Sequence, residues 1–79
     1  PIEKVLDDIP ALFLTEIEAK KLRQGQKIGL NSLKFYNDFI IKYPNYQKFE
    51  KICTINNNRI VAIVEIIDGL VKPKRVINF

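Results

Sequence analysis

The chain has 79 residues, of which 47% are hydrophobic and 28% charged, so it is one small globular domain rather than a disordered or collagen-like chain. It has no histidine and one cysteine, which excludes an internal disulfide, a cysteine-cluster zinc site and the commonest general base near neutral pH. Residues 1–18 carry five acids and one base, whereas residues 19–79 carry twelve bases and four acids. Such a basic body attracts polyanions, most often nucleic acid, although solubility alone explains the charge equally well.

The composition also points to the cytoplasm. Cys53 lies in a strand-like run, and we expect it to be a reduced thiol in the core, as in cytosolic proteins. No stretch approaches the roughly 18 apolar residues of a membrane span, and no signal-peptide pattern is present. The chain has no methionine and begins at Pro1, which predicts that it is a piece of a longer protein.

The N-terminal residues are predicted to form a linker that leads into the domain. Residues 1–11 are interpreted as this linker, with an acidic turn at Asp7-Asp8, and residues 12–79 as the domain itself. The short apolar run at 11–14 is either a first strand or a packed lead-in.

The clearest local signal is a helix near 16–24. Thr15 and Glu18 have the spacing of a capping box, in which the N-cap side chain and the third helical residue satisfy each other's backbone groups. Acidic residues in the first turn and basic residues in the later turns suit the helix dipole, and Gly25 predicts the stop. The apolar residues that we expect this helix to bury are Ile17, Ala19 and Leu22.

The middle of the chain is ambiguous. A brief strand is predicted at 27–30, and the apolar residues of 31–48 fit both a strand and a helix, with a short helix or turn favoured. Asn31 or Ser32 is the expected cap, and Pro44 the expected stop. The aromatic residues of this region either stack on bases or, as we favour, cover a small core. They are Phe35, Tyr36, Phe39, Tyr43, Tyr46 and Phe49.

The final third is predicted to be β-structure. The predicted order is a strand at 51–55, an asparagine turn at 56–58, a strand at 59–67, a two-residue turn at Asp68-Gly69 and a strand at 70–79. The strand at 59–67 is apolar on both faces, which is typical of a central, buried strand. Pro73 cannot donate to a ladder, so the last strand is at an edge or is interrupted there. The predicted class is therefore α+β, mainly β, as a small barrel or sheet.

Basic residues near the C-terminus are the best candidates for function. Lys72-Pro73-Lys74-Arg75 puts three cations on one strand, where they could contact successive phosphates or simply protect an exposed edge. Catalysis finds little support, because Glu65 and Asp68 fit a solvated strand end and a turn. No phosphate-binding glycine loop and no paired metal ligands are present.

The order of these signals resembles a known family. The run Leu6-Asp7-Asp8-Ile9-Pro10-Ala11-Leu12 precedes the capped helix, whose sequence Leu14-Thr15-Glu16-Ile17-Glu18-Ala19-Lys20-Lys21-Leu22-Arg23-Gln24-Gly25-Gln26 follows at once. The chain closes with Asp68-Gly69-Leu70-Val71-Lys72-Pro73-Lys74-Arg75-Val76-Ile77-Asn78-Phe79. Positions 1–30 and 51–79 are similar to the C-terminal part of bacterial tRNA pseudouridine synthase B, in its alphaproteobacterial form. Lys72 stands where the family has arginine, which keeps the charge but loses bidentate reach.

The resemblance implies a PUA-like mixed β pseudo-barrel that helps to hold tRNA. In the family, the full enzyme isomerises a T-loop uridine of tRNA to pseudouridine without cofactor, and its catalytic aspartate lies in another, N-terminal domain. This chain would then be non-catalytic, so that none of its aspartates inherits that role. The implied partners are the T-arm and acceptor stem of tRNA and the chain's own catalytic domain; the chain is expected to be a monomer.

Seven basic residues are the expected RNA contacts. The first choices are Lys72, Lys74 and Arg75, and the second choices are Arg59, Lys27, Arg23 and Lys20. Each is expected to position the RNA backbone rather than to read bases. One alternative is a structural domain that packs on its catalytic domain through the aromatic residues between 35 and 49. Another is a PUA-like domain of a different RNA-modifying protein.

Overall fold

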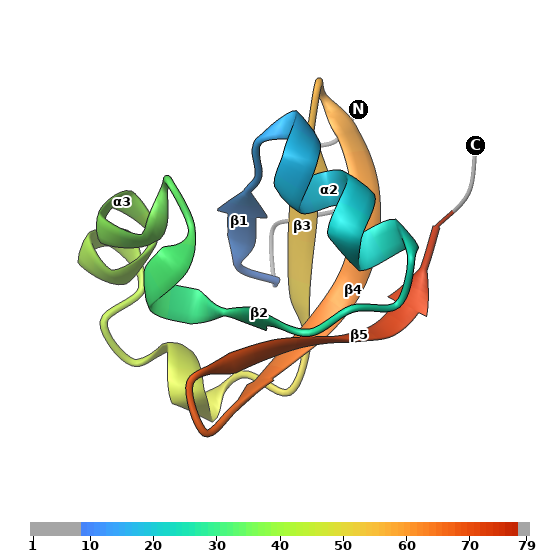
Figure 1. Cartoon of the computed structure of the whole chain (residues 1–79). Coiled ribbons are helices and arrows are strands. Elements are labelled where there is room, and N and C mark those ends of the chain that lie inside the picture. The colour runs from blue at the N-terminus through green and yellow to red at the C-terminus, as the bar shows by residue number, and fades with distance from the viewer. Residues whose placement is uncertain (1–8, 78–79) are drawn as a thin grey trace.

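The computed structural model describes residues 9–77, so the predicted Asp7-Asp8 turn, most of the linker and Asn78-Phe79 lie outside the described residues. Within that range the structure has a curled five-stranded sheet, two α-helices and two 3-10 turns, with α2 against the sheet and α3 beside β1 (Figure 1). The strands are β1 (Ala11–Phe13), β2 (Ile28–Gly29), β3 (Ile52–Asn56), β4 (Arg59–Ile67) and β5 (Leu70–Val76). The helices are α2 (Glu16–Arg23) and α3 (Tyr36–Lys42), and the 3-10 turns are Leu30–Ser32 and Tyr46–Lys48. The predicted α+β, mainly β class with a curled, barrel-like sheet is confirmed.

The sheet has the strand order β1-β3-β4-β5-β2, so β4 is central, as predicted. Strands β3, β4 and β5 form an antiparallel meander joined by two-residue turns at Asn57-Asn58 and Asp68-Gly69. All four turn residues have positive φ, between 53° and 75°, which asparagine, aspartate and glycine tolerate best. The first strand pairs in parallel with β3, and β2 pairs antiparallel with the start of β5 over two residues.

The predicted helix and its cap are confirmed. Thr15 Oγ1 accepts from the Glu18 amide at 3.3 Å, and Glu18 Oε1 accepts from the Thr15 amide at 2.8 Å. Gly25 follows with φ 79°, the left-handed stop. The expectation that Ile17 is buried is wrong: its side chain is 69% exposed. Ile17 lies about 140° around the helix from Leu22, which faces the core.

The ambiguous middle segment forms the favoured short helix, α3, and Pro44 follows its C-cap as predicted. The predicted caps are wrong, because α3 begins after Phe35 with no side-chain cap. The Ser32 hydroxyl instead donates to the Gly29 carbonyl at 2.7 Å within the preceding 3-10 turn.

The aromatic residues of this segment cover the core. Phe39 is buried, and its ring lies 5.4 Å from that of Tyr43 and 5.8 Å from that of Tyr46, measured between centroids. Tyr36 and Phe49 also pack against the buried cluster. These contacts favour the core-covering interpretation over base stacking.

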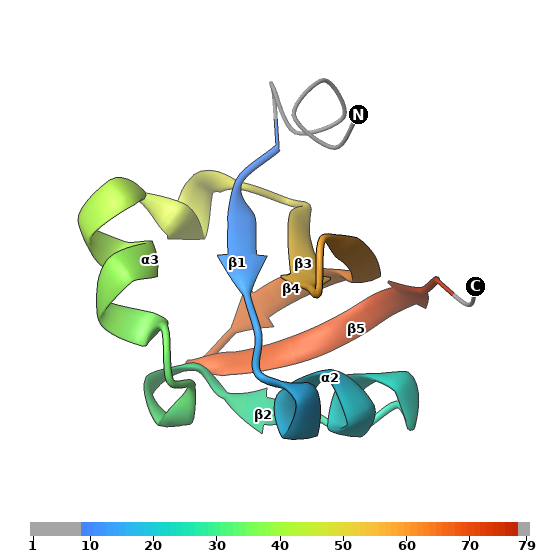
Figure 2. The ribbon, with the colours of Figure 1, turned by 90° about the horizontal axis from the view of Figure 1, so that it is seen from above.

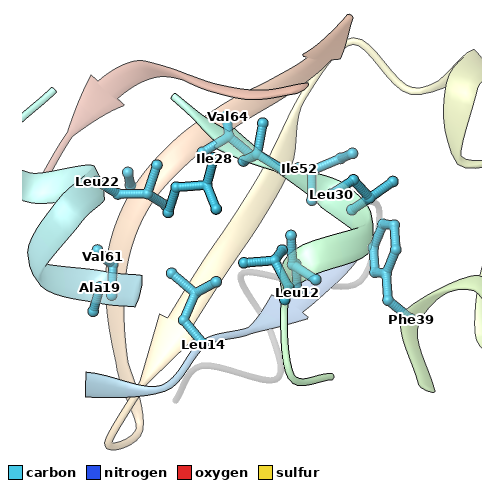
Figure 3. Close-up of a cluster of buried hydrophobic side chains, with 13 residues drawn as sticks. Leu12, Leu14, Ala19, Leu22, Ile28, Leu30, Phe39, Ile52, Val61 and Val64 are labelled. Carbon is cyan, nitrogen blue, oxygen red and sulfur yellow. The ribbon is translucent and has the colours of Figure 1, made fainter. Parts of the chain in front are cut away.

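The core lies between the curled sheet and the elements that cover its inner face. Figure 3 shows the buried side chains of β1, α2, β2, β3 and β4 pointing toward one another. The labelled residues are Leu12, Leu14, Ala19, Leu22, Ile28, Leu30, Phe39, Ile52, Val61 and Val64. Seen from above, β1 stands between α2 and α3 (Figure 2). No helix of the described part of the chain has the length and apolarity needed to cross a membrane.

Candidate nucleic-acid interface

The first-choice cations lie on β5, whose pairing with β4 fixes the direction of each side chain. Glu65 pairs with Lys72, and Ile63 pairs with Arg75. Directly opposed residues of an antiparallel pair project from the same face, and residues two apart on one strand do so as well. Because Ile63 and Glu65 are two apart on β4, Lys72 and Arg75 share a face of the sheet.

A β-bulge on β5 explains how residues three apart come to share that face. The register jumps between the pairs Val64–Pro73 and Ile63–Arg75, which leaves Lys74 as the extra residue. The Lys74 ammonium lies 3.8 Å from a carboxylate oxygen of Glu65, so Lys74 also projects from the face of Glu65. Lys72, Lys74 and Arg75 therefore form one group, which we call the β5 cationic face. Strict alternation would have turned Arg75 the other way.

The opposite face of these strands is the core. Val64 and Val71 lie there, and both side chains are fully buried. Lys72 is half-buried, whereas Lys74 and Arg75 are exposed, so the β5 cationic face is open to a large ligand. Beyond Val71 the outer edge of β5 carries no partner strand within the described residues. Pro73 thus lies at the free edge and directly beside the bulge, so both predicted possibilities are present.

The second-choice residues fall into three places. Lys27 precedes Ile28, whose partner is Val71, so it faces the position of Lys72, one step beyond the last pair of the β2–β5 ladder. Lys20 and Arg23 are exposed on α2, which packs against the inner face of the sheet and so lies on the other side from the β5 cationic face.

Arg59 lies in a third place, which belongs neither to the β5 cationic face nor to α2. It pairs with Asn56 beside the Asn57-Asn58 turn, at the opposite end of β4 from the Asp68-Gly69 turn. The structure therefore brings together four of the seven predicted residues, with Lys27 beside the β5 cationic face, and leaves three elsewhere.

Glu65 is the member of this site that sequence interpretation missed, because it was assigned to a solvated strand end. The signal was available, since a two-residue turn at Asp68-Gly69 fixes the register and sets Glu65 opposite Lys72. The carboxylate therefore lies inside the group of cations rather than outside it.

Among the other titratable groups, Glu50 lines a hollow together with Glu65 and Lys74. Within residues 9–77 no three histidine, cysteine, aspartate or glutamate side chains lie close enough together to hold a metal ion. Cys53 is buried as predicted, and burial raises the pKa of its thiol above the ordinary 9.0. Asp38 lies on α3 and Asp68 in the turn between β4 and β5, so these two aspartates come from different elements.

Comparison with known proteins gives the same family as the sequence signals. The chain is 37% identical over 78 residues to tRNA pseudouridine synthase B of Rhodospirillum rubrum and 36% identical over 78 residues to that of Wolbachia pipientis. It is 36% identical over 81 residues to that of Ehrlichia canis. Each of these matches covers 99% of this chain. The chain is a relative of tRNA pseudouridine synthase B.

The matches also show what share of each relative's length this chain spans. It spans 24%, 19% and 23% of the lengths of those three relatives, and the expected resemblance to their C-terminal part is confirmed. The alignments of 78 or more residues also include positions 31–50, where the motifs had shown no resemblance to tRNA pseudouridine synthase B. No family model matches the chain. No solved structure matches it either.

Proposed function

We propose that this chain is the C-terminal, RNA-holding accessory domain of a tRNA pseudouridine synthase, which isomerises a T-loop uridine of tRNA. The relatives, named tRNA pseudouridine synthase B, support the enzyme class. The chain represents about a fifth to a quarter of their length, so we assign the chemistry to the part of the protein outside it. This domain's role is then to hold the T-arm and acceptor stem while the catalytic domain acts.

One observation carries the RNA-holding role: the bulge at Lys74 gathers three cations on one exposed face of β5. Residues two apart along a strand are separated by about 6.5 Å, so Lys72 and Lys74 can contact different phosphates. Arg75 adds a planar donor group that binds phosphate through two hydrogen bonds. Structured RNA is recognised largely by shape and by its phosphates and 2′-hydroxyls, which suits a cationic face without a base-reading set of side chains.

The test is RNA binding measured at several salt concentrations. A T-arm–acceptor-stem RNA is titrated with the parent chain and with the double variant Lys72→Ala/Lys74→Ala, followed by fluorescence anisotropy. We expect affinity at low salt to fall about tenfold or more, because each charged hydrogen bond is worth roughly 1.5–3 kcal/mol before solvent screening. The slope of log affinity against log salt should flatten by about 1 for each phosphate that the variant no longer neutralises.

A matched control removes the same charge elsewhere. Lys21→Ala/Lys34→Ala takes two cations from exposed positions outside the β5 cationic face. If the control weakens binding and flattens the salt slope as much as the first variant, the effect belongs to net charge and the proposed site is wrong. An unchanged slope in the first variant would remove Lys72 and Lys74 from the contact surface.

A further inference from the structure

An apolar groove lies between β1 and α3, away from the β5 cationic face. Its volume is about 370 Å³. The residues that line it are Ala11, Phe13, Phe35, Asp38, Phe39, Lys42 and Tyr43. Four of these seven are aromatic, and the two charged ones lie on α3. An apolar floor with a few charged side chains is typical of a protein–protein contact.

Phe13 gives the groove an anchor. Its side chain is 53% exposed although phenylalanine is usually buried. It belongs to β1, an edge strand that pairs only with β3 among the described strands. Neighbouring Leu12 points into the core and is fully buried, so the alternation of the strand turns Phe13 outward. Large exposed aromatic residues beside a groove are the usual energetic centre of an interface.

We propose that this groove is the docking surface for the part of the polypeptide that precedes this domain in the full-length protein. The chain spans 24% and 19% of two relatives and resembles their C-terminal part, so about three quarters or more of such a protein lies before it. The groove is lined by Ala11 and Phe13 of β1, which is the first element of the described domain, so this element links the groove to the part of the chain that precedes the domain. A covalently linked partner needs little affinity, since its effective concentration is high.

The docking surface and the RNA surface are then separate parts of the domain. Lys72, Lys74 and Arg75 come from β5, which is separated from β1 by β3 and β4 in the sheet. A domain held through β1 and α3 would keep its cationic strand exposed for tRNA. The proposed docking is therefore compatible with the proposed RNA role, but it does not depend on that role.

The experiment measures thiol-labelling rates in the full-length protein, in the absence of RNA. Single cysteines replace two groove residues, as Phe13→Cys and Asp38→Cys, and two exposed residues outside the groove, as Ile17→Cys and Ile41→Cys. The controls match the probes closely, since Ile17 is 69% exposed and Ile41, 77% exposed, is on the same helix as Asp38. Labelling by the parent protein is subtracted, and thermal unfolding checks that each variant is folded.

We expect both groove cysteines to react about tenfold more slowly, or slower still, than the two control cysteines, because a docked surface exposes its thiols only when it opens. Equal rates at all four positions would overturn the proposal. Protection that disappears on dilution, together with a dimer mass in light scattering, would overturn it in favour of a second copy of the protein. Since no RNA is present, either failure leaves the proposed RNA role standing.

Discussion

Lys74 lies diagonally across the β4–β5 ladder from Glu65, with 3.8 Å between its Nζ and the carboxylate Oε2. The directly opposed residue of Glu65 is Lys72, so the carboxylate that pairs with Lys74 lies on the strand position facing a second lysine of the β5 cationic face. The side chains of Lys74 and Glu65 are 39% and 30% exposed. An ion pair in such partial exposure adds about 0–1 kcal/mol to stability. Its larger effect is on the charge that a polyanion encounters.

Replacing Glu65 by Gln should therefore strengthen RNA binding. The change removes the negative charge nearest to the proposed phosphate contacts and frees the Lys74 ammonium. We expect affinity for a T-arm–acceptor-stem RNA to rise about two- to fivefold at low salt and to converge with the parent at high salt, where charges are screened. Asp38→Asn removes one negative charge from α3 and is the control. An equal gain in both variants would show that net charge alone is responsible.

The stability of α2 should depend on Leu22 and hardly on Ile17. Leu22 is fully buried in the core, so Leu22→Ala should lower the free energy of unfolding by about 2–5 kcal/mol through lost burial and a residual cavity. Ile17→Ala removes an exposed side chain on the same helix and should change it by no more than about 0.5 kcal/mol. Urea unfolding monitored by circular dichroism measures both. Similar losses in the two variants would contradict the described orientation of the helix.

Both carboxylate oxygens of Glu18 should contribute to the stability of the fold. Oε1 accepts from the Thr15 amide, and Oε2 accepts from the Lys34 amide at 3.0 Å, which ties the start of α2 to the segment before α3. Glu18→Ala should cost about 1–3 kcal/mol, and Glu18→Gln should cost less because it keeps one acceptor oxygen. Hydrogen exchange at the Lys34 amide reports the second bond directly. The amide should exchange faster in the Ala variant, and an unchanged rate would contradict the prediction.

The buried Cys53 thiol should cause the free energy of unfolding to decrease at alkaline pH. Burial holds the pKa of the folded thiol above 9.0, so the unfolded chain loses the thiol proton first as the pH rises. The contribution is complete below about pH 9 and is lost as the pH rises from there through the folded pKa. Urea midpoints at pH 8 and pH 10.5 should therefore fall more in the parent than in Cys53→Ala. The same alkaline decrease in both chains would show that other groups cause it.

Local signals predicted much of this fold because each depends on neighbouring residues. The capping box needs only Thr15 and Glu18, and the hairpin turn needs only Asp68-Gly69, so both follow directly from the sequence. The orientation of Ile17 away from the core could also be predicted, because the helix period alone fixes the angle between Ile17 and Leu22 around the helix axis. The prediction that Ile17 is buried was wrong because it rested on the apolar character of the side chain and not on its position around the helix.

The remaining features depend on distant residues. The parallel pairing of β1 with β3 joins Ala11 to Cys53, more than half the chain away, and no short motif encodes such a contact. The bulge at Lys74 appears only when β4 and β5 are aligned, so simple alternation along β5 could not bring Arg75 to the face of Lys72. The groove between β1 and α3 likewise exists only after both elements pack.

The pairing of β1 with β3 also sets an order of assembly. Strands β3, β4 and β5 are joined by two-residue turns, and such hairpins form within about 1–10 μs. The seam between β1 and β3 must wait, since closing a long loop carries an entropy cost before its contacts can form. The groove beside Phe13 is therefore completed after the β3-β4-β5 meander has formed. A neighbour that docks there can bind only after β1 has joined β3, so docking depends on a contact between residues far apart in the sequence.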